Sequence, residues 1–147
     1  MADALSTRDL AGKFAFRFSG FSMRNNILYN LAGVGSFTID KDGKLLGSHR
    51  SSLTPLQGAD ATLQAGAYAL DGEISLSEDG ITGYAKIFFK GETKTSLDLN
   101  GEFYLVAAGS ADRLWLVSSR ETIPPTAGAV SATPADELVS LEAIRFP

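Results

Sequence analysis

The chain has 147 residues, of which 44% are hydrophobic and 20% charged, and this balance suits one folded domain with a buried core. It contains no cysteine and one histidine, which excludes disulfides, cysteine-based zinc or iron–sulfur sites and sites built from several histidines of one chain. The net charge is −4 and no basic cluster occurs, so nucleic acid is not an expected partner.

The first ten residues predict an extended tail, because they carry acidic residues and no long apolar run. The same features do not fit a signal peptide. No segment reaches the roughly 20 apolar residues that a membrane-spanning helix needs. We therefore expect a cytoplasmic protein without a membrane partner, although a mature secreted domain that has lost its signal peptide would look the same.

Residues 13–19 alternate strictly between two faces. Phe14, Phe16 and Phe18 share one face, and Arg17 lies on the other. This period of two predicts a half-buried strand. Residues 21–30 are mixed, which fits either a loop or the end of a long strand with a bulge.

A hairpin is predicted around Asp42-Gly43, since this dipeptide favours a tight turn between residues 31–39 and 44–53. Gly33 and Gly35 lie on one face of the first of these strands. Glycine inside a strand indicates a bend, a bulge or a close backbone approach, as in a strongly coiled barrel. The alternative is that the two glycines only weaken an edge strand.

Further strands are predicted at residues 62–70, 73–77, 81–89, 93–106 and 113–119, with short connections between them. One of these connections is a tight turn at Asp71-Gly72. Short connections can join only antiparallel neighbours. Residues 121–137 hold three of the five prolines and predict a long loop. Residues 138–147 predict a last strand that pairs with the first and closes a barrel. A helix over residues 136–143 is the alternative, because Pro134 and Asp136 resemble a helix start.

The predicted fold is thus all-β, with residues 1–147 forming a single antiparallel up-and-down barrel of about eight strands. Several segments carry a resemblance: a Gly-x-Phe-x-Phe start, then residues 32–47, 65–68 and 113–119. Over most of residues 10–120 the chain resembles small bacterial β-barrel proteins of the calycin or allene-oxide-cyclase-barrel type. The resemblance implies a lipocalin-like or allene-oxide-cyclase-like barrel. Some barrels of this type bind small apolar molecules and some are cyclases, but no catalytic residue of the family matches a position here.

His49 is the only imidazole, and it is the first candidate for a catalytic role as a single general acid or base. No Gly-x-Ser-x-Gly elbow occurs, so a hydrolase triad is not expected. The alternative for His49 is a position at the barrel rim or on the surface, near a strand end. The acidic pairs at residues 40/42 and 78/79 are interpreted as turn caps, and neither a metal site nor a cofactor is predicted.

Arg17 and Tyr68 are the other candidate catalytic residues. If either points into the barrel it needs a polar partner, such as a ligand carbonyl or carboxylate, because a buried unpaired group costs about 1–3 kcal/mol. The alternative is that they face solvent, and the faces of Tyr84 and Tyr104 look more exposed still. The candidate ligand-binding residues are Phe16, Phe37, Arg50, Tyr84, Phe103 and Tyr104.

These residues support a non-catalytic barrel that holds a small hydrophobic or aromatic molecule. The alternative is a cofactor-independent isomerase, cyclase or lyase that uses the same interior with one acid–base group. A third hypothesis is a homo-oligomeric interaction module that packs through outer apolar residues such as Ile87 or Trp115.

Overall fold

The computed structural model describes residues 4–24, 27–56, 63–93, 98–123, 133–134 and 136–146. A short 3-10 helix, η1 (Thr7–Leu10), precedes the strands. The strands are β1 (Gly12–Arg24), β2 (Ile27–Ile39), β3 (Lys44–Pro55), β4 (Gln64–Leu76), β5 (Thr82–Gly91), β6 (Leu99–Ala108), β7 (Arg113–Ile123), β8 (Thr133–Pro134) and β9 (Asp136–Arg145). None of the helical segments in the described residues has the length and apolar character needed to cross a bilayer.

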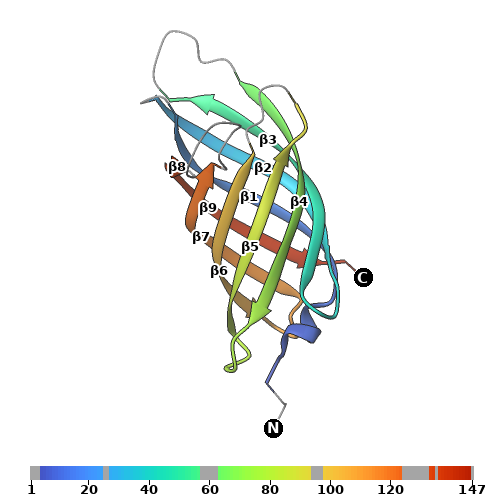
Figure 1. The fold of residues 1–147 in the computed structure, drawn as a ribbon. Coiled ribbons are helices and arrows are strands. Elements are labelled where there is room, and N and C mark those ends of the chain that lie inside the picture. The colour runs from blue at the N-terminus through green and yellow to red at the C-terminus, as the bar shows by residue number, and fades with distance from the viewer. Residues whose placement is uncertain are drawn as a thin grey trace.

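The strands form one closed antiparallel barrel (Figure 1). Each strand from β1 to β7 pairs with the next one along the chain, and β9 pairs with both β7 and β1. The two residues of β8 extend the sheet only beside Thr122 and Ile123 at the end of β7. The predicted all-β, eight-stranded up-and-down barrel is confirmed, and it is consistent with the calycin-like architecture that the resemblance implied.

Aromatic rings and glycines on neighbouring strands fit together inside the barrel. Phe16 and Phe18 of β1 pair in register with Gly35 and Gly33 of β2. A Cβ atom on either glycine would overlap the phenylalanine ring beside it. The same Cβ atom would also overlap a backbone carbonyl oxygen of β3, that of Arg50 at Gly33 and that of Ser48 at Gly35. The close backbone approach predicted at these glycines is therefore confirmed, and an aromatic ring approaches each of them as well.

The turn predicted at Asp71-Gly72 is wrong, because β4 runs without interruption through both residues. Gly72 pairs with Ile87, and a Cβ atom on Gly72 would overlap the carbonyl oxygen of Lys86 in β5. Gly72 therefore allows β4 and β5 to lie close together, and it does not form a turn. A dipeptide that favours a turn locally can occupy a strand interior when the neighbouring strand leaves no room for a side chain.

The ends of two other predicted elements also differ. Residues 21–24 and 27–30 are the ends of long strands, as one of the two alternatives proposed, but they pair with each other in continuous register and without the predicted bulge. The helix considered for residues 136–143 is wrong, because β9 covers them. The long loop predicted for residues 121–137 is wrong at 121–123, which belong to β7, at 133–134, which form β8, and at 136–137, which belong to β9. Residues 124–132 and 135 lie outside the described residues.

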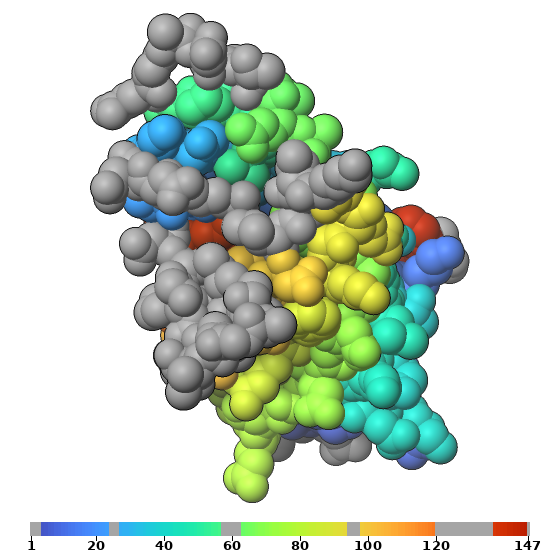
Figure 2. All heavy atoms as spheres, turned by 45° about the horizontal axis from the view of Figure 1, so that its top comes forward, coloured from blue at the N-terminus to red at the C-terminus, as the bar shows by residue number. Residues whose placement is uncertain are grey.

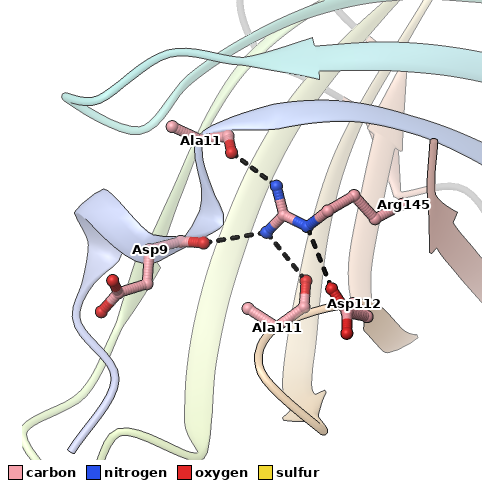
Figure 3. Close-up of polar contacts among 5 residues, drawn as sticks. All are labelled: Asp9, Ala11, Ala111, Asp112 and Arg145. Atoms are coloured by element: carbon pink, nitrogen blue, oxygen red, sulfur yellow. Dashed lines mark hydrogen bonds and ion pairs between the residues drawn. The ribbon is translucent and has the colours of Figure 1, made fainter. Parts of the chain in front are cut away.

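One end of the barrel is closed by Arg145 together with η1. The Arg145 guanidinium donates hydrogen bonds to the carbonyl oxygens of Ala11 at 2.6 Å, Asp9 at 2.9 Å and Ala111 at 2.9 Å (Figure 3). It also pairs with Asp112 at 3.4 Å and lies over the Phe14 ring. We call this group the Arg145 seal.

Helix η1 adds an apolar side chain to the same end. Leu10 is fully buried in the core, and Thr7 accepts a hydrogen bond from the Leu76 backbone amide at 3.1 Å. The extended tail predicted for residues 1–10 is therefore wrong for residues 7–10. Helix η1 and the end of β9 both lie toward this end of the barrel (Figure 1).

Candidate binding pocket

The remaining interior space lies away from the Arg145 seal. Alternation along β9 places Val139, Leu141 and Ala143 inside the barrel, between Glu137 at one end of the strand and Arg145 at the other. A cavity of about 40 Å³ lies beside the first part of this row. Its lining is mostly aromatic and aliphatic: Phe16, Phe18, Leu31, His49, Ser51, Tyr68, Phe89, Leu99, Phe103, Glu137, Val139 and Leu141.

His49 is held among aromatic rings and is only 8% exposed. The Tyr68 ring stacks on the imidazole with centroids 4.8 Å apart. Phe18 at 4.8 Å and Phe89 at 5.5 Å meet the imidazole edge to face. The surface position considered for His49 is therefore wrong: its alternate place on β3 turns it inward, with Ser51 on the same face.

One imidazole nitrogen has no polar partner. The Nδ1 atom of His49 is buried, and no hydrogen bond reaches it from the described residues. A neutral imidazole has one N–H donor and one lone-pair acceptor. Burying an N–H without an acceptor is the costlier choice, so we assign the proton to Nε2 and the lone pair to Nδ1.

The surroundings keep this imidazole uncharged at neutral pH. Burial lowers the pKa of His49 from its ordinary value of 6.5 to about 4, and the negative charge of Glu137 partly opposes this shift. A base with so low a pKa accepts a proton weakly at neutral pH. The site is therefore better suited to accepting a hydrogen bond than to removing a proton.

Four of the predicted site residues meet in the cavity. His49, Tyr68, Phe16 and Phe103 all line it. Phe37 lies in the interior but outside the lining, where its ring packs 5.4 Å from the Phe16 ring.

The other four predicted site residues lie on the outer face of the barrel. Arg17 has a side chain that is 78% exposed and that pairs with Glu142 at 3.3 Å. Arg50 is exposed as well. Tyr104 is 62% exposed, and its ring lies 6.3 Å from that of half-buried Tyr84. Parts of β5 and β6, the strands that carry these two tyrosines, are visible at the surface in Figure 2.

The two residues named for an interaction module differ in their burial. Ile87 is buried, because it lies on the inner face between Gly72 of β4 and Gly101 of β6, so its predicted outer position is wrong. Trp115 is exposed and pairs in register with exposed Val106 on the outer face.

Sequence reasoning missed two polar residues of the lining, Ser51 and Glu137. Both were detectable from alternation, since Ser51 follows His49 by two positions and Glu137 precedes Val139 by two. Glu137 was missed because the proline-containing segment before it was interpreted as a loop through residue 137. In the described part of the chain, no group of three or more potential ligand side chains is placed to hold a metal ion.

No protein-family model matches this sequence, and no curated protein matches it. The chemistry of the cavity therefore carries the functional argument.

Proposed function

We propose that this calycin-like barrel is a binding protein that holds a small hydrophobic or aromatic molecule in the cavity beside His49. The observation that carries the proposal is an aromatic-lined cavity at the end of the interior away from the Arg145 seal. A well-packed interior leaves few voids larger than a water molecule. Binding sites for small molecules combine an apolar wall with a few polar groups, as this cavity does.

The size of the cavity limits the ligand. Its volume of about 40 Å³ is well below the roughly 150 Å³ of an engineered cavity that binds benzene. As the side chains stand, this volume suits no more than a few water-sized groups, and a ring-sized molecule requires lining rings to move. Phe89 and Phe103 are two of these lining rings, and they meet edge to face with centroids 6.2 Å apart.

The catalytic alternative has less support. A cofactor-independent isomerase, cyclase or lyase needs an acid–base group whose pKa suits the working pH. Burial lowers the pKa of His49 to about 4, and Arg17, the second catalytic candidate, lies outside the barrel. Both observations favour binding over turnover.

Filling the cavity tests the proposal. In Ser51→Leu a larger side chain replaces the inward-facing hydroxymethyl group, and we expect saturable binding of benzene, phenol or indole to be lost. Ser52→Leu adds the same volume at the neighbouring position on the outer face of β3 and should leave binding unchanged. Binding is followed by backbone amide chemical shifts, and the melting temperature of each variant confirms that it folds.

Two results would overturn the proposal. One is the absence of saturable binding of any of these probes by the unmodified protein. The other is a folded Ser51→Leu variant that binds the probes as tightly as the unmodified protein does.

A further inference from the structure

We propose that Nδ1 of His49 is the hydrogen-bond acceptor for the ligand, so that the cavity selects neutral molecules that carry a hydroxyl or N–H group, such as phenols or alcohols, over carboxylic acids. This assignment deepens the proposed function and rests on it. It names a polar contact that would orient a ligand among the rings.

The first support is the environment of Nδ1. Buried polar atoms in proteins nearly always have a hydrogen-bond partner, and each exception needs an explanation. Three of the closest rings, those of Phe16, Phe18 and Phe89, have no polar atom to offer. Tyr68 presents its ring face to the imidazole, and its hydroxyl does not bond to Nδ1. A ligand donor would satisfy this nitrogen.

The second support is the charge of the lining. The imidazole is neutral at physiological pH and can accept a hydrogen bond through its lone pair. The described lining side chains include no lysine or arginine, and they do include the carboxylate of Glu137. A buried carboxylate ligand needs a compensating positive charge, which these residues do not supply. A neutral donor avoids that cost.

The third support concerns how a ligand reaches Nδ1 and how this depends on the size of the ligand. Nδ1 is shielded in the present arrangement, so a ligand reaches it only when the imidazole turns about its Cβ–Cγ bond or a neighbouring ring moves aside. Movement of a lining ring is also what a ring-sized ligand requires. We therefore expect entry of the ligand and exposure of Nδ1 to occur together.

The single histidine makes a direct test possible, because a histidine-selective ¹⁵N spectrum reports on this imidazole alone. We expect the free protein to show a neutral ring with the proton on Nε2. Saturating phenol or 2-propanol should move the Nδ1 resonance toward lower frequency, as hydrogen bonding to a lone pair does. Benzene, which lacks a donor, should leave the Nδ1 resonance near its starting position.

A binding comparison provides the second arm. Unmodified protein should bind phenol at least as tightly as benzene and should bind benzoate much more weakly. In His49→Phe, which keeps an aromatic ring but removes Nδ1, the phenol-to-benzene affinity ratio should fall about tenfold. Arg50→Ala changes the adjacent outward-facing residue and should leave the ratio unchanged.

The possible outcomes distinguish failure of the acceptor role of His49 from failure of the proposed binding function. If phenol binds in the cavity but neither shifts Nδ1 nor loses its relative affinity in His49→Phe, the acceptor role is wrong while the binding function stands. If benzoate binds as tightly as phenol, the selection for neutral donors is wrong. If none of the probes binds, the proposed function fails, and the acceptor role fails with it. Should His49→Phe not fold, the ¹⁵N measurement on the unmodified protein decides.

Discussion

The polar side chains at the two ends of the barrel interior differ in how completely they are hydrogen-bonded. At one end, Arg145 makes three hydrogen bonds to backbone carbonyls, an ion pair with Asp112 and a contact with the Phe14 ring. At the other, His49 is surrounded by rings, and its Nδ1 atom has no hydrogen bond from the described residues. The first arrangement stabilises the native fold, whereas the second leaves an acceptor for which the fold has no use.

Under the proposed function, this difference distinguishes Arg145, whose polar atoms are used by the fold itself, from His49, whose Nδ1 atom is left to accept a hydrogen bond from a ligand. Both residues lie at inward-facing positions of a strand. A buried polar group that is fully satisfied by its own chain contributes to stability. One that is left unpaired costs stability and persists in native proteins chiefly where a function requires it.

The largest expected effect is the pH dependence that His49 causes. Its pKa is about 4 in the folded state and near 6.5 when unfolded, so the unfolded chain binds more protons between these values. The contribution of neutral His49 to the free energy of unfolding is fully present above pH 6.5 and is lost as the pH falls toward 4. We expect a loss of up to about 3 kcal/mol.

Urea unfolding at a series of pH values measures this loss. The His49→Phe variant supplies the control, because acidic side chains titrate in the same range in both proteins. The difference between the two pH profiles isolates the imidazole. Identical profiles would show that His49 is not buried among the rings in the folded protein.

Removal of the Arg145 seal should have the next largest effect on stability. Arg145→Met keeps much of the side-chain length but leaves three carbonyl oxygens without their donor, and we expect a loss of about 2–3 kcal/mol in the free energy of unfolding. Equilibrium unfolding in urea checks this value. Because the cavity lies at the other end, phenol binding by the folded variant should be unchanged. Loss of binding without loss of stability would reverse the roles assigned to the two ends.

The packing of the rings at the cavity end predicts an intermediate effect. In Gly33→Ala the new methyl group overlaps the Phe18 ring and approaches the Arg50 carbonyl oxygen, so we expect destabilisation of about 2 kcal/mol. In a Phe18→Leu background the same substitution should cost less, because the smaller side chain can move aside. Additive effects in the double variant would mean that the ring and the glycine do not share this space.

The smallest effect is expected for the outer ion pair. Arg17→Ala removes the contact with Glu142 from a mostly exposed position, and the change in unfolding free energy should stay within about 0.5 kcal/mol. Ligand affinity should not change. A large loss of binding in a stable Arg17→Ala variant would restore the catalytic or ligand-binding role that the sequence suggested for this arginine.

The barrel itself was predictable because alternation and short connections are local features. Phe14, Phe16 and Phe18 identify an inner face without knowledge of any other strand, and Asp42-Gly43 identifies a turn. Gly72 was misinterpreted because its role depends on the backbone of β5. The identity of the neighbouring strand and its register are tertiary facts that a local pattern does not contain.

The candidate site was predictable only in part, for a related reason. Alternation within one strand could have placed Ser51 and Glu137 inside and Arg50 outside. The stacking of His49 on Tyr68, however, depends on their pairing across β3 and β4. The unpaired state of Nδ1 depends on every ring around it, and only the assembled barrel reveals it.

The central claim is that the cavity beside His49, and not the outer surface, binds a small neutral molecule. Titration with phenol, followed by the amide shifts of ¹⁵N-labelled protein, tests it most directly. We expect saturable shifts centred on His49, Tyr68 and Val139, with little change around Arg145. Shifts confined to the outer face around Tyr104 and Trp115, or no saturable shifts at all, would contradict it.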